Sequence, residues 1–315
     1  MLKSKKLEKG QTIGVVSPAS PSFNKSQILR GKETLESLGY KVILSKNLNK
    51  TKGLVSASEE ERAQDINDMF RHDEIDAIFV SQGGYGSAQL ISRLDYDVIR
   101  QNPKIFTGFS DITSLHLAIG KFAGLITFHG PGMGRFNSED LTDYTRDSFF
   151  RALSQTEPAG EIRPADEKKW LNPIGAGQCE APLAGGNLTL ICASLGTPYE
   201  IDTKGKILLI EDIETEPWVF DHMLCHLRNA GKLNDLAGIV VGECVKCEPR
   251  KHDPAFFCDT SLEDVLAYYI EPLKIPAVYG LPLGHTKDLA TLPLGVMARL
   301  DADAKKLIIL ESGVK

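Results

Sequence analysis

The chain has 315 residues, enough for about two domains of ordinary size. Apolar residues make up 42% and charged residues 25% of the sequence, a composition typical of a globular protein with a sizeable core and not of a disordered chain. The 36 basic and 42 acidic side chains leave a net charge of −6. This charge disfavours nucleic acid and anionic membrane surfaces as partners, because both attract clustered Lys and Arg. No apolar run approaches the ~18 residues of a membrane span.

The beginning of the sequence is basic, but no apolar segment of signal-peptide length follows it, so we expect a cytoplasmic protein. The six cysteines are unevenly spaced, which does not suit a disulfide framework. In a reducing compartment we expect them to be mostly buried thiols.

Apolar runs and helical repeats alternate through the first half of the sequence. The apolar runs predict strands at 12–17, 40–44, 77–80 and 104–107. Helical spacing and capping residues predict helices at 26–38, behind Ser58, behind Ser87 and from Asp111 to Phe122. This alternation predicts a Rossmann-like α/β domain with a mostly parallel, doubly wound sheet.

Proline, glycine and charge replace the apolar repeat at 156–177, which we interpret as a linker between an N-terminal domain at 1–155 and a C-terminal domain at 178–315. In the C-terminal domain, the segment from Ala181 reads as a strand, a turn and a helix start. Further strands are expected at 206–210, 238–242, 297–301 and 307–310, and helices at 220–230 and 262–269. We therefore expect a β-rich α+β fold for this domain.

The turn Gly108-Phe-Ser-Asp gives the most informative local signal of chemistry. A buried strand ends at Gly108 and a helix begins near Asp111, so Ser110 lies on a sharp strand-to-helix turn. Such a turn exposes the hydroxyl and directs free helix N–H groups, including that of Asp111, toward a developing negative charge. The pattern resembles a nucleophile elbow, although Ile112 replaces the second glycine. The alternative is that Ser110 or Asp111 is simply a helix cap.

The segment Gln82-Gly-Gly-Tyr-Gly-Ser also follows a strand and precedes a helix. The adjacent Gly83 and Gly84 allow backbone N–H groups to face an anionic ligand. The segment lacks the spacing of a dinucleotide site, and by itself it is better explained as a tight turn. Since loops at the carboxyl ends of parallel strands share one edge of a sheet, we expect it to lie at the same edge as Ser110.

Two polar residues of the C-terminal domain could complete a catalytic set. Glu211, with Asp212 behind it, follows a buried strand, and His285 lies in a turn fixed by proline and glycine. A serine nucleophile needs a histidine as base, and that histidine needs a carboxylate to orient it. Ser110, Glu211 and His285 would supply these groups in that order along the chain. Taken separately, Glu211 is also explained as a loop acid and His285 as a surface histidine.

Two groups of potential metal ligands are better explained without a metal. His222 and His226 lie four residues apart on an expected helix, but Met223 stands where a zinc peptidase carries its glutamate. The second group consists of Cys244, Cys247, His252 and Cys258. Its spacing is one residue longer than that of a zinc knuckle, and we expect no metal there.

Ordered motifs along nearly the whole chain resemble the serine L,D-carboxypeptidases of muropeptide recycling, the muramoyltetrapeptide carboxypeptidases. This family also contains microcin-immunity peptidases. Each motif is weak alone, but their number and order make the resemblance specific. They include Val16-Ser-Pro-Ala-Ser, Gly83-Gly-Tyr-Gly, Gly108-Phe-Ser-Asp-Ile-Thr, Thr127-Phe-His-Gly-Pro, Leu183-Ala-Gly-Gly-Asn, Leu209-Ile-Glu-Asp and Gly284-His.

The resemblance implies a two-domain enzyme in which Ser110 is the nucleophile, His285 the general base and acid, and Glu211 the residue that orients the histidine. The implied oxyanion donors are the backbone N–H groups of Asp111 and of Gly83 or Gly84. The implied reaction removes the terminal D-alanine from a murein tetrapeptide in the cytoplasm. The resemblance further implies a homodimer that needs no metal or organic cofactor.

Two positions depart from the family's pattern, because Gln82 and Gln89 stand where arginines are typical. The loss of two positive charges could alter how an anionic peptide is held, so the sequence defines the reaction better than the substrate. The alternative substrates are acyl-sulfamoyl or aminoacyl-nucleotide conjugates, with Trp170 or Trp218 as the platform for the base. A hypothesis from another class is a binding protein that closes on a peptide or sugar without chemistry.

Overall fold

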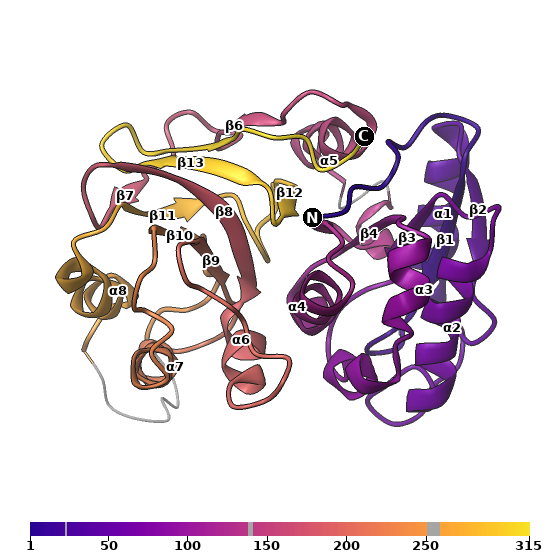
Figure 1. The fold of residues 1–315 in the computed structure, drawn as a ribbon, viewed down its shortest axis with the longest axis horizontal. Helices are drawn as coiled ribbons and strands as arrows, with labels where there is room; N and C mark the ends of the chain where they lie inside the picture. Colours follow the sequence, from indigo (N-terminus) through magenta and orange to yellow (C-terminus); the bar gives the residue numbers. More distant parts are fainter. Residues whose placement is uncertain (23, 138–140, 251–258) are drawn as a thin grey trace. The chain divides into compact units, whose positions relative to one another are not determined.

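The computed structural model describes residues 1–22, 24–137, 141–250 and 259–315, and the chain divides into two compact units (Figure 1). The first unit contains Met1–Ala159, Leu289–Val296 and Glu311–Lys315. The second contains Gly160–Asp288 and Met297–Leu310. Because late segments return to the first unit, neither unit is one continuous stretch of chain.

In the described residues, the first unit has a six-stranded sheet in the order β12-β5-β4-β3-β1-β2. The strands are β1 (Thr12–Val16), β2 (Lys41–Leu44), β3 (Ala77–Val80), β4 (Ile105–Gly108), β5 (Thr127–His129) and β12 (Leu292–Leu294). The first five pair in parallel, and β12 pairs antiparallel with β5 at the edge. The parallel order confirms the predicted doubly wound α/β fold, whereas the addition of β12 from the far end of the sequence was not expected.

Helices cover both faces of this sheet. They are α1 (Lys25–Ser37), α2 (Glu59–Arg71), α3 (Tyr96–Gln101), α4 (Thr113–Phe122) and α5 (Asp143–Ser154), with 3-10 helices η1 (Ser87–Arg93), η2 (Ser110–Ile112) and η3 (Met133–Arg135). Ile78 of β3 belongs to a buried cluster with Phe70 of α2 and Leu115 of α4. Successive strand side chains point to opposite faces, so Phe79 packs on the other side, with its ring centroid 5.2 Å from that of Phe149 in α5.

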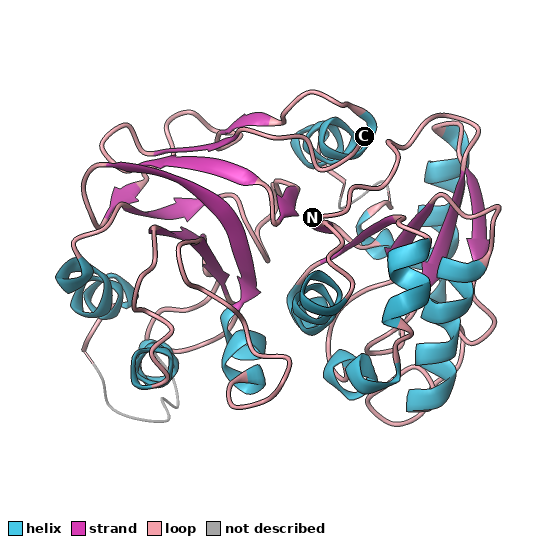
Figure 2. Ribbon diagram, in the orientation of Figure 1, coloured by secondary structure: helices cyan, strands magenta, loops and turns pink. Residues whose placement is uncertain are grey.

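The second unit is built on an eight-stranded sheet, counted over the described residues, in the order β6-β14-β13-β8-β9-β10-β11-β7 (Figure 2). Its strands are β6 (Gly160–Ile162), β7 (Asn172–Pro173), β8 (Gln178–Asn187), β9 (Ile207–Glu211), β10 (Gly238–Gly242), β11 (Ala277–Leu281), β13 (Met297–Asp301) and β14 (Lys306–Ile309). Its helices are α6 (Leu188–Ser194), α7 (Pro217–Asn229), α8 (Leu262–Ile270) and the 3-10 helix η4 (Glu271–Leu273). The central strands β8 to β11 run parallel, and the others pair antiparallel. The β-rich second domain is thereby confirmed.

Three local features differ from the sequence expectations. The segment 156–177, expected as a linker, carries β6 and β7, which pair with β14 and β11 of the second sheet. The helix expected behind Ser87 is a 3-10 helix. The turn expected in 181–190 is absent, because β8 continues through Gly185 and Gly186 until α6 begins at Leu188.

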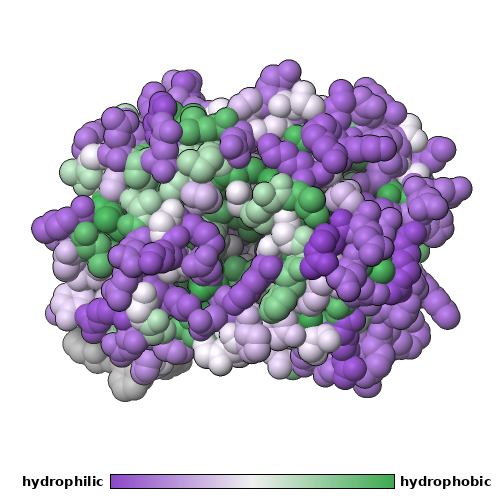
Figure 3. All heavy atoms as spheres, viewed as in Figure 1, coloured by the Kyte–Doolittle hydropathy of each residue, from purple (hydrophilic) through white to green (hydrophobic). Residues whose placement is uncertain are grey.

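Hydrophilic residues cover most of the face drawn in Figure 3, and apolar residues form smaller patches on it. Leu54 and Trp170 are among the large apolar side chains that stay exposed. In the part of the chain that the structure describes, no helix is both long enough and apolar enough to cross a membrane.

Gly185 explains why β8 continues where a turn was expected. Its φ of 138° is one that side-chain-bearing residues rarely adopt, and a Cβ at this position would overlap the carbonyl oxygen of Leu209 in β9. Glycine therefore serves here to bring two parallel strands together and not to reverse the chain.

We expect Gly185→Ala to lower the free energy of unfolding by at least ~3 kcal/mol, because the new methyl group meets backbone that cannot move aside. The control is Gly205→Ala, which also requires a positive φ (64°) but places its Cβ in open space. The control should lose about 1 kcal/mol from backbone strain alone. Urea unfolding followed by circular dichroism measures both, and equal losses would contradict the close approach.

Candidate active site

Ser110 lies on the turn between β4 and α4 with a left-handed backbone, at φ 65°. Phe109 before it is extended, and Ser110 to Ile112 form the 3-10 turn that leads into α4. A left-handed conformation strains a serine, and such strain is typical of a nucleophile at the end of a buried strand. The Ser110 side chain is half-buried. The structure therefore has the strand-to-helix turn that the sequence predicted.

The loop after β3 passes directly against this turn. A Cβ built on Gly83 would lie 3.1 Å from the carbonyl oxygen of Phe109, 3.1 Å from Cβ of Ser110 and 3.5 Å from the backbone nitrogen of Asp111. Gly84 has a φ of 113°, which glycine adopts without strain. Backbone N–H groups of both loops thus lie at one edge of the sheet, as expected for neighbouring parallel strands.

The same edge contains the point where the strand order reverses. The order β2-β1-β3-β4-β5 places this point between β1 and β3, and ligands of such sheets bind outside the carboxyl ends of the strands there. Side chains link the loops around it. Gln82 donates to the carbonyl of Pro21 at 2.8 Å, and the hydroxyl of Ser20 accepts from the backbone of Tyr85 at 3.1 Å. Gln82, at a position where the family typically has arginine, therefore joins the loop after β3 to the loop after β1.

The carboxylate of Asp111 has a structural role. The side chain is buried and accepts from the backbone nitrogen of Ser87 at 2.8 Å, while the Ser87 hydroxyl donates to the carbonyl of Asp111. Burial raises the pKa of the Asp111 carboxyl, and the hydrogen bonds from Ser87 act in the opposite direction. These contacts fix the start of η1 to the turn that carries Ser110.

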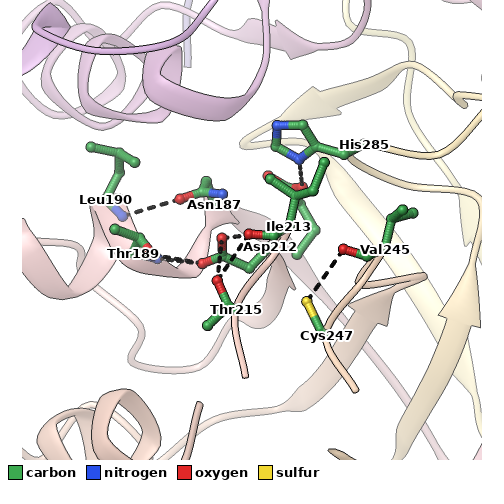
Figure 4. A network of polar contacts seen from close by, with 10 residues as sticks. Asn187, Thr189, Leu190, Asp212, Ile213, Thr215, Val245, Cys247 and His285 are labelled. Carbon is green, nitrogen blue, oxygen red and sulfur yellow. Dashed lines mark hydrogen bonds and ion pairs between the residues drawn. The ribbon is translucent and has the colours of Figure 1, made fainter. Parts of the chain in front are cut away.

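In the second unit, His285 and Glu211 form a hydrogen-bonded pair (Figure 4). The Nδ1 atom of His285 lies 2.8 Å from Oε2 of Glu211. Glu211 ends β9 and its side chain is fully buried, whereas the His285 side chain is 15% exposed in the loop after β11. A carboxylate on Nδ1 fixes the tautomer and orientation of the ring and stabilises its protonated form, and Nε2 is then the nitrogen that exchanges protons.

Glycines make room for this pair. Gly284 has a φ of 87°, and a Cβ there would overlap Oε2 of Glu211. A Cβ on Gly242 would come within 3.0 Å of Cβ of Glu211. In the described part of the chain Oε1 of Glu211 has no hydrogen-bond partner, and Oε2 makes the contact with His285.

Asp212, the neighbour of Glu211, has a different task. Its carboxylate accepts from the backbone nitrogen and hydroxyl of Thr189 at 2.9 and 2.8 Å, from the backbone of Ile213 at 2.9 Å and from the Thr215 hydroxyl at 3.2 Å (Figure 4). These bonds hold the start of α6 to the end of β9. Of the two adjacent acids, Glu211 contacts His285, and Asp212 joins the end of β9 to the start of α6 by hydrogen bonds.

The candidate metal ligands do not assemble into a site in the described ranges, which contain no group of three or more His, Cys, Asp or Glu suited to a metal. His222 and His226 lie on α7. Cys244 and Cys247 are buried free thiols, and a hydrogen bond between them, together with burial, raises the pKa of Cys244. His252 and Cys258 lie outside the described residues.

The sequence analysis missed Arg62, the largest of the fully buried side chains. Arg62, Ile66 and Met69 are spaced four and three residues apart, so they lie on the same face of α2 and are all buried. A charged residue at an apolar position of a helix is the signal that could have found it.

Comparison with known proteins identifies the family. A family model described as the LD-carboxypeptidase N-terminal domain matches residues 13–130, and one described as the LD-carboxypeptidase C-terminal domain matches residues 180–300. A probable murein peptide carboxypeptidase of Bacillus subtilis is 40% identical over 313 residues, covering 99% of this chain and 95% of the relative.

Solved structures agree with this assignment. The muramoyltetrapeptide carboxypeptidase from Oxalobacter formigenes superposes with a TM-score of 0.81 at 28% identity, covering 95% of this chain and 98% of that one. The microcin C7 self-immunity protein MccF in complex with aspartyl sulfamoyl adenosine gives a TM-score of 0.88 at 28% identity, with full coverage (100%) of both chains. The curated MccF of Escherichia coli is 31% identical over 330 residues, covering 96% of this chain and 94% of the relative. The chain therefore belongs to the LD-carboxypeptidase family and is a serine carboxypeptidase.

We expect Gly284→Ala to lower carboxypeptidase kcat at least ~100-fold, because its methyl group displaces the carboxylate that orients His285. Gly196→Ala is the matched control, since Gly196 has a similar φ of 76° in the same unit but no neighbour within 4 Å of the added Cβ. Steady-state kinetics on a peptide substrate measures both variants. Wild-type turnover by a folded Gly284→Ala protein would show that activity does not depend on the His285–Glu211 contact.

Proposed function

We propose that this protein is a serine L,D-carboxypeptidase that removes the terminal D-alanine from murein tetrapeptides in cell-wall recycling. Ser110 is the proposed nucleophile, His285 the general base and acid, and Glu211 the residue that orients the histidine. The observation that carries the proposal is the left-handed Ser110 turn, with the Gly83 loop packed against it. The 40% identity to a probable murein peptide carboxypeptidase supports the choice of substrate.

In the proposed reaction the Ser110 hydroxyl attacks the carbonyl carbon that precedes D-alanine, and Nε2 of His285 takes its proton. The negative charge that develops on the carbonyl oxygen receives hydrogen bonds from the backbone N–H groups of Asp111 and of Gly83 or Gly84. Such donors contribute about 3–4 kcal/mol each to lowering the barrier. Joint action of these groups requires the serine of the first unit to meet the histidine of the second in the reacting enzyme, and this is part of the proposal.

Collapse of the tetrahedral intermediate breaks the C–N bond. The protonated His285 returns its proton to the departing amine of D-alanine, and a tripeptide acyl group stays on Ser110. Water then attacks the ester with His285 again acting as base, which releases the tripeptide and restores the hydroxyl. The 2.8 Å contact with buried Glu211 supports this role, because the carboxylate stabilises the imidazolium formed in both steps.

The proposal also includes a cytoplasmic location and a homodimer. Both come from the resemblance to muropeptide-recycling enzymes, in which the tetrapeptide is met inside the cell. Size-exclusion chromatography with light scattering and fractionation of the producing cells test these two parts separately.

A second substrate class is supported by the likeness to MccF, whose solved structure contains aspartyl sulfamoyl adenosine. In this alternative the same serine would attack the acyl group of an acyl-sulfamoyl nucleotide. Trp170, whose side chain is 63% exposed, is the more accessible candidate for stacking on the base, since Trp218 is half-buried at the start of α7.

We expect Ser110→Ala to fold as the wild type does and to abolish release of D-alanine, because no other hydroxyl occupies the strained turn. Ser114→Ala, four residues further along in α4, is the control and should keep wild-type activity. Mass spectrometry of products from defined tri-, tetra- and pentapeptide stems is the measurement. D-alanine release by Ser110→Ala at the wild-type rate would refute the assignment of the nucleophile.

A paired assay on the tetrapeptide stem and aspartyl sulfamoyl adenosine separates the alternatives. Loss of one alanine from the tetrapeptide only is the result we expect. Turnover of aspartyl sulfamoyl adenosine alone would replace the proposed substrate with the second class. Turnover of neither compound by the folded wild type would contradict both substrate assignments.

A further inference from the structure

The guanidinium of Arg62 is 1% exposed and donates hydrogen bonds to four acceptors in the first unit. Its Nε lies 3.1 Å from the carbonyl of Ala57, and Nη1 lies 2.6 Å from the carbonyl of Pro18 and 2.9 Å from that of Gly86. Its Nη2 lies 2.6 Å from Oε1 of Gln89. The side chain thereby joins α2 to three segments, which contain Pro18, Ala57, and Gly86 with Gln89.

These segments surround the point where the strand order reverses. Pro18 follows β1, Ala57 precedes α2, and Gly86 ends the glycine loop after β3. Burial lowers the pKa of Arg62, so keeping this cation out of water carries a cost in free energy. The carboxylates of Glu59 and Asp111 act in the opposite direction and favour the charged form.

A chain of contacts leads from Arg62 to the nucleophile turn. The residue after Gly86 is Ser87, whose backbone nitrogen and hydroxyl bond to the carboxylate and carbonyl of Asp111. The other end of the same loop, at Gly83, packs against Ser110 and the backbone nitrogen of Asp111. The loop is therefore held at Gly86 and Ser87 by Arg62 and Asp111, and at Gly83 it packs against the turn itself.

We propose that Arg62 is a positioning residue for hydrolysis, which holds the 83–87 loop so that its backbone N–H groups face the developing oxyanion. This inference rests on the proposed function, and Arg62 acts through the loop without touching substrate. It also gives Gln89 a role, because a neutral amide oxygen accepts from the guanidinium where a second cation would repel it.

The first test is Arg62→Met, which keeps an unbranched apolar stem but removes the guanidinium with its charge and its hydrogen-bond donors. We expect kcat to fall at least ~100-fold with KM changed less than ~3-fold, since only interactions made in the transition state weaken. Affinity for a phosphonate analogue of the tetrahedral intermediate should fall by the same factor as kcat/KM. Arg62→Lys keeps the charge with fewer donors and should retain an intermediate kcat.

Lys104 provides the matched control, because it is also a buried cation in the first unit. Its ammonium donates to the carbonyls of Met69 at 2.9 Å and His72 at 2.5 Å. Because Lys104 precedes β4, it lies at the amino ends of the parallel strands, and the Ser110 turn lies at their carboxyl ends. Lys104→Met should lower the free energy of unfolding as Arg62→Met does. Its kcat per folded molecule should stay at the wild-type value.

Two results would overturn the positioning role of Arg62. One is a folded Arg62→Met protein with kcat within ~3-fold of wild type, and the other is an equal loss of kcat in Lys104→Met. Should Arg62→Met not fold, Arg62→Lys decides the question by whether its analogue affinity falls. Full activity of Ser110→Ala would instead refute the proposed function itself, so the two failures are distinguishable.

Discussion

The candidate chemistry of the first unit depends on how closely two backbone loops approach at the carboxyl edge of its sheet. Parallel neighbours β3 and β4 end at the same edge, and Gly83 has no side chain to separate its loop from the Ser110 turn. Because the loops are this close, their backbone N–H groups lie on the same side. Backbone donors of this kind are held more rigidly than side-chain donors. Hydrogen bonds of the buried Asp111 and Arg62 side chains fix both loops in this contact.

In the second unit a buried carboxylate, and not a backbone contact, positions the functional side chain. A fully buried carboxylate is costly unless another group interacts with it, and Glu211 meets one ring nitrogen of His285. The missing side chain of Gly284 lets the carboxylate reach the ring, while Asp212 holds the strand end still. In both units glycine creates the close contact, and a buried ionisable group keeps it in place.

The sequence predicted those parts of the fold and site that local patterns determine. Strands and helices of the first unit, and the common edge of Gly83 and Ser110, follow from apolar spacing and from the geometry of parallel strands. Spacing carried no signal for the contact between Glu211 and His285, which lie 74 residues apart. The pair was predicted from the groups that a serine nucleophile needs, and from the family resemblance. The return of β12 to the first sheet and the passage of β8 through Gly185 depend on distant backbone, which no local pattern encodes. Arg62 was missed because a charged residue in a helix normally indicates a solvent-facing side.

The pairing of β12 with β5 bears on how the protein matures on the ribosome. The segment Leu289–Val296 is made more than a hundred residues after the strand it covers, and Val314 later bridges Ser4. Until those segments emerge, β5 is an unpaired sheet edge, the kind of surface that invites association with other nascent chains. A nascent chain stalled before Leu289 would therefore be prone to aggregation even though Met1–Ala159, the larger part of its first unit, has been synthesised.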